Sequence, residues 1–219
     1  MLADLVLGQT ALAIMLFVPA TVHFWQGWAF FAVSFVLSFF MCLYYQRLDP
    51  ELLARRMLRR EKIGAQKIIL LLLKLLYAGV FLLCGFDHRC GWTPNFLMPV
   101  PAWLSVLALL GYAGGNLLLV PVMNTNRYAA SIIRVETGQT LADRGPYRLV
   151  RHPMYAVGIL SWFWIPLALG SFVAVPLALL IIPVLVWRLL NEEKMLRRDL
   201  PGYSDYCQRI RYRLIPSIW

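Results

Sequence analysis

One twelve-residue block carries the side chains best suited to chemistry in this chain. Residues 144–155 read RGPYRLVRHPMY and combine three arginines, one histidine, two prolines and two tyrosines just before a long apolar run. His152 and Tyr155 are three positions apart, so they share one face of a helix that begins here. Pro153 is favoured in the first turn of such a helix. The block is either an ordinary basic anchor at a membrane surface or part of a site.

A turn precedes this helix start. Gly145-Pro146 predicts a tight turn that directs Tyr147 back toward the helix N-terminus. The amide groups of a helix N-terminus attract an anion or a carboxylate. We therefore interpret Tyr147, His152, Pro153 and Tyr155 as one half of a cradle for a polar cofactor, and Arg144, Arg148 and Arg151 largely as topology signals.

A second candidate group lies further along the chain. Arg188 and Glu192 are four positions apart and share a helix face, whereas Glu193 is rotated by about 100°. The alternative interpretation is an exposed ion pair, which stabilises a helix by only about 0.3–0.5 kcal/mol. If the two halves form one site, the chain must bring residues 188–193 back to the block at 144–155.

The composition indicates a membrane protein. The chain has 219 residues, of which 60% are hydrophobic, and its mean hydropathy is +0.65. The apolar residues form runs of about 20, which match the roughly 30 Å hydrocarbon thickness of a bilayer. The alternating segments of a transmembrane barrel are missing from the sequence. The predicted fold class is an all-α polytopic membrane protein.

The apolar runs predict four transmembrane helices, at about 2–22, 28–46, 65–84 and 102–123. A short amphipathic helix is expected at 50–62, with Asp49 as its N-cap and Pro50 at its first position. Residues 153–190 predict a membrane helical hairpin that is broken at Gly170-Ser171, and a tail helix follows to about residue 200. We treat 1–219 as one domain, with a four-helix membrane part (1–123) and a cofactor-binding and catalytic part (124–219).

Three sequence features inside these runs concern packing. Gly111, Gly114 and Gly115 predict close helix contact in the fourth run. The hairpin contains three prolines, which predict kinked or broken helices: Pro166, Pro176 and Pro183. Lys74 lies in the middle of the third run, where a buried ion pair and snorkelling to the interface are equally consistent with the sequence.

The net charge of +10 does not indicate nucleic acid binding, because the basic residues gather in three groups, at 47–67, 127–151 and 188–213. Clustering in alternate loops follows the positive-inside rule, so we expect all three groups, both termini and the site to face the cytoplasm next to membrane lipids. His88 and His152 are expected on opposite sides of the membrane, so no two-histidine metal site is expected.

Taken together, the motifs resemble a known family. The run GPYR-x-x-RHPMY at 145–155, followed by EE-x-x-L at 192–196 and GY-x-x-Y at 202–206, resembles the isoprenylcysteine carboxyl methyltransferases and the related phospholipid methyltransferases. The resemblance is strong over 124–219. The segment DPELLARR at 49–56 is similar to bacterial-type members of the same group.

The resemblance implies an integral-membrane enzyme that uses S-adenosylmethionine. It implies that Arg188 and Glu192 act on the substrate, and both glutamates, including Glu193, would favour the positive charge of the cofactor. The implied cofactor-binding residues are Gln139, Thr140, Leu141, Ala142, Tyr147, His152, Pro153, Met154 and Tyr155. In the family, an upstream glutamine also contacts the cofactor. Without gaps in the alignment this glutamine corresponds to Ile132 here, and Glu136 takes its place only if the alignment is shifted.

Several functions remain open at this level. The acceptor would be lipophilic or membrane-delivered: an isoprenylcysteine carboxylate, a phosphatidylethanolamine amine or a small apolar metabolite. Arg188 favours an anionic acceptor. An NADPH-dependent sterol or enone reductase is an alternative, because some such proteins look alike in their C-terminal halves. A non-catalytic membrane factor that keeps the fold is another.

Overall fold

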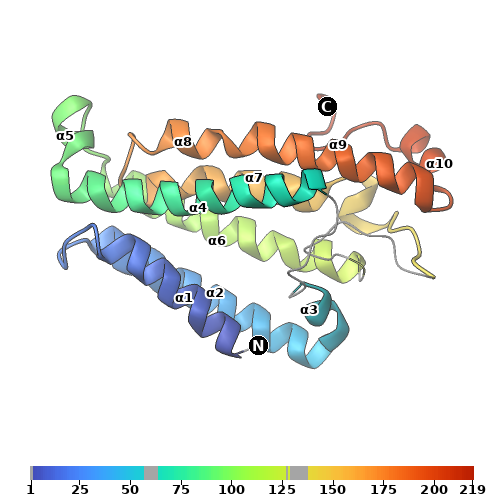
Figure 1. Cartoon of the computed structure of the whole chain (residues 1–219), viewed down its shortest axis with the longest axis horizontal. Coiled ribbons are helices and arrows are strands. Elements are labelled where there is room, and N and C mark those ends of the chain that lie inside the picture. The colour runs from blue at the N-terminus through green and yellow to red at the C-terminus, as the bar shows by residue number, and fades with distance from the viewer. Residues whose placement is uncertain (1, 57–63, 127, 129–137) are drawn as a thin grey trace.

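A computed structural model describes residues 2–56, 64–126, 128 and 138–219 (Figure 1). Within these residues all regular structure is helical, and the long helices run side by side along one axis. The elements are α1 (Leu2–Phe17), α2 (Trp25–Leu48), α3 (Pro50–Arg56), α4 (Gly64–Cys90), α5 (Trp92–Phe96), α6 (Ala102–Thr125), η1 (Gly145–Arg148), α7 (Pro153–Ala168), α8 (Val175–Leu179), α9 (Ile181–Asp199) and α10 (Tyr203–Arg209).

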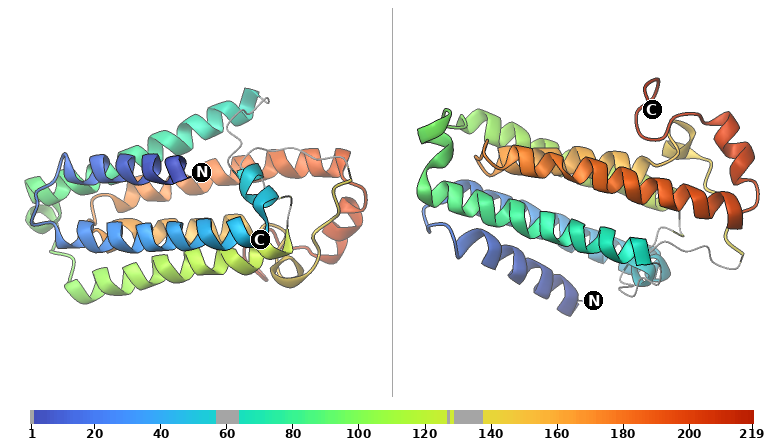
Figure 2. Two further views of the ribbon diagram at one scale, coloured as in Figure 1. Left: turned by 90° about the horizontal axis from the view of Figure 1, so that it is seen from below. Right: turned by 45° about the horizontal axis from the view of Figure 1, so that its top comes forward.

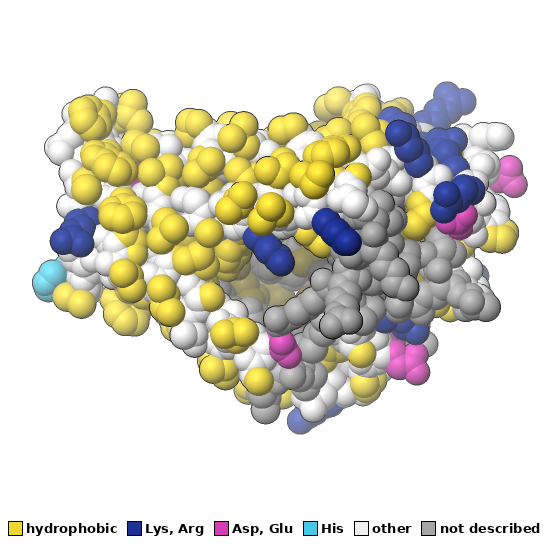
Figure 3. Space-filling model, in the orientation of Figure 1, with side chains coloured by type: hydrophobic (Ala, Val, Ile, Leu, Met, Phe, Trp, Pro, Cys, Tyr) yellow, Lys and Arg dark blue, Asp and Glu magenta, His cyan; other side chains and the backbone are white. Residues whose placement is uncertain are grey.

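Among the described residues, four helical stretches are long and apolar enough to cross a bilayer, which confirms the predicted fold class. They are α2, α4, α6 and the stretch Val175–Asp199 that combines α8 and α9. Apolar helices α1 and α7 are shorter, with 16 residues each, or about 24 Å at the usual rise of an α-helix. Hydrophobic side chains cover most of the surface in Figure 3, and Lys and Arg gather toward the end where α10 lies.

Three helix ends differ from the predicted bounds. Helix α1 ends at Phe17 rather than near residue 22, because Pro19 follows and disfavours helical backbone in the residue before it. Helix α2 begins at Trp25, three residues earlier than expected. Helix α4 continues to Cys90 rather than ending near Cys84. A Cβ at Gly85 would lie 2.8 Å from the carbonyl oxygen of Leu16, so this extension depends on close contact with α1.

The short helix α3 begins as the sequence indicates. The carboxylate of Asp49 accepts a hydrogen bond of 3.0 Å from the amide of Leu52, and Pro50 opens the helix. This is an ordinary N-cap, which satisfies one of the amides left unpaired at a helix start. The described part of α3 ends at Arg56, and the predicted continuation to residue 62 lies outside the described residues.

The hairpin region has two arms. Helix α7 forms the first arm and contains Pro166, the chain turns at residues 169–174, and α8 and α9 return (Figure 2). Helix α9 continues without a break from the return arm into the expected tail helix and ends at Asp199. Gly202 then takes a positive φ of 79° before α10, a backbone conformation that favours glycine.

Helices α6 and α7 pack at close range through small residues. A Cβ added at Gly111 would lie 2.6 Å from the ring of Trp164, and one added at Gly115 would collide with the Ser161 hydroxyl. A Cβ at Gly114 would meet nothing within 4 Å. Two of the three glycines therefore permit the contact, as the sequence predicted. Lys74 of α4 is exposed, which fits snorkelling rather than a buried ion pair.

A buried polar cluster locks the end of the molecule opposite α10. Asp87 at the end of α4 is 2% exposed. Its carboxylate accepts hydrogen bonds from the Thr93 amide at 2.6 Å and from the hydroxyls of Thr93 and Ser171. Ser171 lies in the hairpin turn, so this cluster joins α4 and α5 to the turn between α7 and α8. It fixes the hairpin whose two arms carry the candidate site.

Candidate active site

The start of α7 is held by backbone pairing with the C-terminal tail. His152 is the N-cap residue and Pro153 the first residue of the helix. The amides of Arg151 and His152 donate hydrogen bonds of 2.9 Å to the carbonyls of Tyr212 and Arg213. These two bonds fix the backbone that directs the His152 ring into the molecule, where the side chain is 5% exposed.

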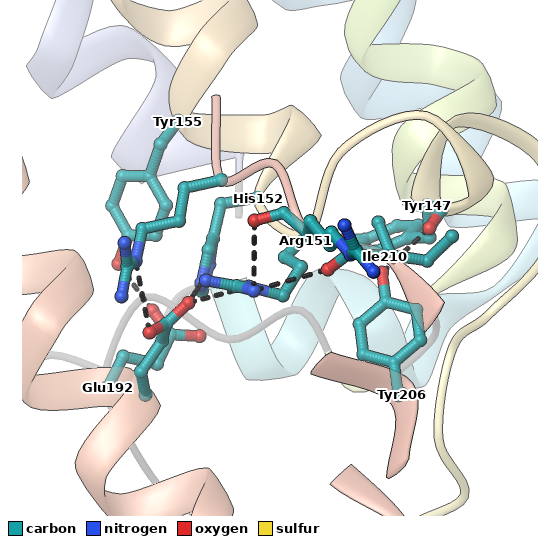
Figure 4. Close-up of polar contacts among 10 residues, drawn as sticks. Tyr147, Arg151, His152, Tyr155, Glu192, Tyr206 and Ile210 are labelled. Carbon is teal, nitrogen blue, oxygen red and sulfur yellow. Dashed lines mark hydrogen bonds and ion pairs between the residues drawn. The ribbon is translucent and has the colours of Figure 1, made fainter. Parts of the chain in front are cut away.

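Tyr155 and Glu192 point toward each other at one side of the polar cluster (Figure 4), and Arg188 contacts the same tyrosine. The Tyr155 hydroxyl donates to Oε2 of Glu192 at 2.5 Å. It accepts from Nε of Arg188 at 3.1 Å. Helix α7 supplies the tyrosine and α9 supplies the two charged residues, so the hairpin brings together the two groups that the sequence separates by more than 30 residues. Arg188 is only 7% exposed, so it is not the exposed surface ion pair of the alternative interpretation.

Glu193 holds a second, buried group. Its Oε1 lies 2.8 Å from Nε of Arg151 and 3.2 Å from Nε2 of His152, and its Oε2 lies 3.1 Å from Nε of Arg213. Consecutive residues on a helix point about 100° apart, which is why Glu192 contacts Tyr155 while Glu193 contacts His152. Glu193 thus balances the buried charge of Arg151 and orients the histidine ring.

The structure corrects the interpretation of Arg151 as largely a topology signal. Arg151 is buried, with only 6% of its surface exposed. Beside its ion pair with Glu193, its Nη1 donates to the carbonyls of Ile210 and Arg211 at 3.1 and 3.2 Å. Arg144 and Arg148 are exposed, as a topology signal requires. The sequence pattern could not separate the three arginines, because the partners of Arg151 lie more than 40 residues further along the chain.

Tyr147 lies in η1 and is buried. Its hydroxyl accepts a hydrogen bond of 3.1 Å from Nδ2 of Asn126, and its carbonyl accepts one of 2.7 Å from the Tyr206 hydroxyl. Burial raises the pKa of the Tyr206 phenol, so this hydroxyl remains a donor throughout the physiological pH range. Tyr147 therefore joins the end of α6 to α10, and its aromatic ring is fixed at both ends.

The segment before η1 lines a cavity of about 550 Å³ at the α10 end of the bundle. The walls come from the α2–α3 junction, the end of α6 and the segment 140–142. The lining residues are Leu48, Asp49, Pro50, Glu51, Arg55, Asn124, Thr125, Asn126, Tyr128, Thr140, Leu141 and Ala142. Asn126 connects this cavity to Tyr147.

The structure places the predicted site residues in three neighbouring groups. Tyr155, Arg188 and Glu192 form the first, and His152 with Glu193 forms the second. The third comprises the cavity residues Thr140, Leu141 and Ala142, with Gln139 just before them and Tyr147 joined through Asn126. Pro153 is buried at the start of α7, and Met154 packs against the cluster of Tyr45, Leu52 and Met123. Positions 132 and 136, which concern the family glutamine, lie outside the described residues.

Four residues of this region were missed by the sequence reasoning as site components: Asn126, Arg151, Tyr206 and Arg213. Tyr206 belongs to the GY-x-x-Y motif, so a signal for it was present. Arg213 contributes an ion pair with Glu193 and its guanidinium lies 5.1 Å from the centre of the Trp219 ring. Nothing in the spacing of Asn126 or Arg213 distinguishes them from ordinary loop residues.

Comparison with known proteins supports the family resemblance. Residues 103–201 match the model of the phospholipid methyltransferase family, which covers α6, η1 and α7 to α9 and includes both the HPMY run and the two glutamates. No curated protein gives a significant match to the chain. The match confirms the family resemblance that the sequence motifs indicate, which is to the phospholipid methyltransferases, a group of membrane methyltransferases.

Proposed function

We propose that this protein transfers a methyl group from S-adenosylmethionine to a lipophilic or membrane-delivered acceptor. The observation that carries the proposal is the convergence of Arg188, Glu192 and Tyr155 across the two arms of the hairpin. Tyr155 and Glu192 belong to two of the motifs that carry the resemblance, and Arg188 lies four residues before Glu192. All three residues lie inside the segment that matches the family.

The chemistry of the donor set fits S-adenosylmethionine. The cofactor carries a positive sulfonium and an ammonium group, and Glu192 and Glu193 supply two carboxylates close to the start of α7. The cavity lined by Thr140, Leu141 and Ala142 offers polar side chains and main-chain groups to a nucleoside. When bound, S-adenosylmethionine would supply an electrophilic methyl group. We assign its binding to Gln139–Ala142, Tyr147, His152, Pro153, Met154, Tyr155 and Glu193.

Methyl transfer needs alignment more than it needs many catalytic groups, because a direct displacement requires the nucleophile, the methyl carbon and the leaving sulfur in line. The Tyr155 hydroxyl, held by Arg188 and Glu192, gives the site such fixed geometry. Arg188 presents a planar guanidinium, the group that best recognises a carboxylate or phosphate. We assign it to the acceptor.

Glu192 has a role that depends on the acceptor. A carboxylate acceptor is already a nucleophile and requires no base. An amine acceptor loses a proton on methylation, and we assign the Glu192 carboxylate as the base that takes it, since this carboxylate already accepts a hydrogen bond from the Tyr155 hydroxyl at 2.5 Å. The buried position of Arg188 beside it favours an anionic acceptor, of which an isoprenylcysteine-type carboxylate is one.

The site is proposed to face the cytosol. The basic side chains gather toward the end of the molecule that carries α10 (Figure 3), and the positive-inside rule assigns such an end to the cytoplasm. On this topology the polar cofactor enters from the cytosol, and the acceptor arrives from the bilayer beside α7 and α9.

Purified protein in lipid nanodiscs tests the cofactor assignment. Thermal shifts are recorded with S-adenosylmethionine and with NADPH, the cofactor of the reductase alternative. We expect stabilisation by S-adenosylmethionine only, and its loss in Glu193→Gln. Stabilisation by NADPH alone would overturn the proposal. If S-adenosylmethionine stabilises the protein, mass spectrometry of methylated lipids and small molecules identifies the acceptor.

A further inference from the structure

The C-terminal segment 210–219 forms a hook that folds back against the start of α7. It follows α10, yet its end lies beside α9 and set back from α10 along the long axis (Figures 1 and 2). The hook closes on itself: the main-chain oxygen of Trp219 accepts from the amides of Leu214 and Ile215 at 2.9 and 3.1 Å. Ser217 takes a positive φ of 66° at its tip.

The outer side of the hook is apolar and uncovered. Ile215 is 52% exposed and Ile218 is 75% exposed, and Tyr212 and Trp219 are also partly exposed. The region around it is basic, because residues 194–219 contain six Lys or Arg and two acidic residues. Exposed aliphatic side chains beside arginine and aromatic residues are typical of segments that lie in the headgroup region of an anionic bilayer.

The inner side of the hook is part of the site. The carbonyls of Tyr212 and Arg213 accept the amides of Arg151 and His152. The Arg213 side chain pairs with Glu193 at 3.1 Å and lies over the Trp219 ring. A displacement of the hook would therefore break the backbone pairing at the start of α7 and remove one of the three side chains that contact the Glu193 carboxylate.

We propose that residues 210–219 dock on anionic lipid headgroups and that this contact fixes Arg151, His152 and Glu193 in the arrangement described above. The lipid contact is inferred from the exposed apolar residues of the hook and from its positive charge. Its effect on cofactor affinity rests on the proposed function. An anionic surface attracts the arginines, the two isoleucines enter the headgroup region, and the hook is held against α7.

Hydrogen exchange of the Arg151 and His152 amides tests the contact without any need for activity. The protein is placed in nanodiscs of phosphatidylcholine and in nanodiscs of an equimolar mixture with phosphatidylglycerol. We expect these two amides to exchange about tenfold more slowly in the anionic lipid, with the difference lost at high salt. Equal exchange in the two lipids would overturn the proposal.

Matched variants assign the effect to the hook. In Ile215→Ser/Ile218→Ser we expect the lipid dependence to disappear, and in Arg211→Gln, which changes an exposed side chain, we expect it to weaken. Val18→Ser/Val22→Ser makes the same kind of change at residues that are 70% and 75% exposed in the turn between α1 and α2, and it should leave the dependence intact. A hook variant that behaves like this control would contradict the assignment.

Affinity for S-adenosylmethionine, measured in the same nanodiscs, is the second readout. We expect it to be several-fold higher in the anionic lipid for the unchanged protein and equal in the two lipids for the isoleucine variant. If the exchange of the two amides depends on the lipid but the protein binds no S-adenosylmethionine, the proposed function is rejected and the lipid contact of the hook is supported. If the protein binds S-adenosylmethionine but the two amides exchange equally in both lipids, the proposed function is supported and the lipid contact is rejected.

Discussion

The hydroxyl of Tyr155 lies 2.5 Å from Oε2 of Glu192. The tyrosine lies near the start of α7, the first arm of the hairpin, and the glutamate lies in α9 on the return arm, so this bond joins the two arms at the α10 end. Arg188 donates to the same hydroxyl, which leaves little freedom to the ring. The proposed chemistry depends on this geometry, and the following predictions separate it from purely structural roles.

The two adjacent glutamates should respond differently to the same substitution. Glu193→Gln leaves the buried guanidinium of Arg151 without its ion pair, and breaking one side of a buried pair costs about 3–5 kcal/mol. Glu192→Gln keeps a hydrogen-bonding side chain of the same size at the Tyr155 hydroxyl and should cost about 1 kcal/mol or less. Denaturant unfolding in micelles measures both. Equal losses would contradict the division of roles.

Tyr155→Phe removes one hydroxyl and keeps the ring. Without this hydroxyl, Arg188 and Glu192 lose the group that holds them in register, and we expect methyl transfer to fall by about 10²-fold, the usual effect of a small misplacement in a site that works by alignment. The expected loss of stability is only about 1–2 kcal/mol. Tyr77→Phe, at a tyrosine of α4 that is 38% exposed and is not among the site residues, is the control for hydroxyl loss. Full activity in Tyr155→Phe would exclude this role.

Alanine at the three glycines of α6 should separate contact from helix propensity. Gly111→Ala and Gly115→Ala force Trp164 or Ser161 to move, and overpacking of this kind costs about 1–3 kcal/mol. Gly114→Ala meets open space and should be neutral or stabilising by up to about 1 kcal/mol, since alanine is the better helix former. Thermal unfolding of the three variants checks the order. A destabilised Gly114→Ala would show that this face packs against something else.

Asp87→Asn should weaken the lock at the opposite end of the bundle. The amide cannot accept all the bonds that Thr93 and Ser171 donate to the carboxylate, and hydrogen bonds to a charged group are worth about 1.5–3 kcal/mol each. We expect a lower unfolding temperature with unchanged affinity for S-adenosylmethionine, because the proposed site lies at the α10 end. Asp205→Asn, at an exposed residue of α10, is the control. A loss of affinity larger than the loss of stability would indicate coupling through the hairpin.

The sequence predicted the elements whose signals are local. The apolar runs, the cap formed by Asp49 and Pro50, and the break after residue 200 each depend on a few neighbouring residues, and the structure contains them. The meeting of Arg188 and Glu192 with Tyr155 was also predictable, because a hairpin returns its second arm to the level at which the first began. The extension of α4 to Cys90 was not, since it depends on contact between Gly85 and α1.

The sequence could not predict which arginine is buried. Arg144, Arg148 and Arg151 look alike in a basic block, and only the return of Glu193 and of the main chain at 210–211 gives Arg151 its partners. The cavity beside Thr140 was hidden for the same reason, because its walls come from three parts of the chain. Long-range contacts of this kind leave no periodic pattern in one sequence.

Transfer of an isotopically labelled methyl group from S-adenosylmethionine into a lipid extract tests the central claim most directly. The protein is used in nanodiscs, and Arg188→Lys, which keeps the charge but loses the planar fork, is compared with it. We predict a labelled lipid-soluble product with the unchanged protein and at least tenfold less with Arg188→Lys at equal folded fraction. Label that enters no acceptor, or enters equally with Arg188→Lys, would contradict the account.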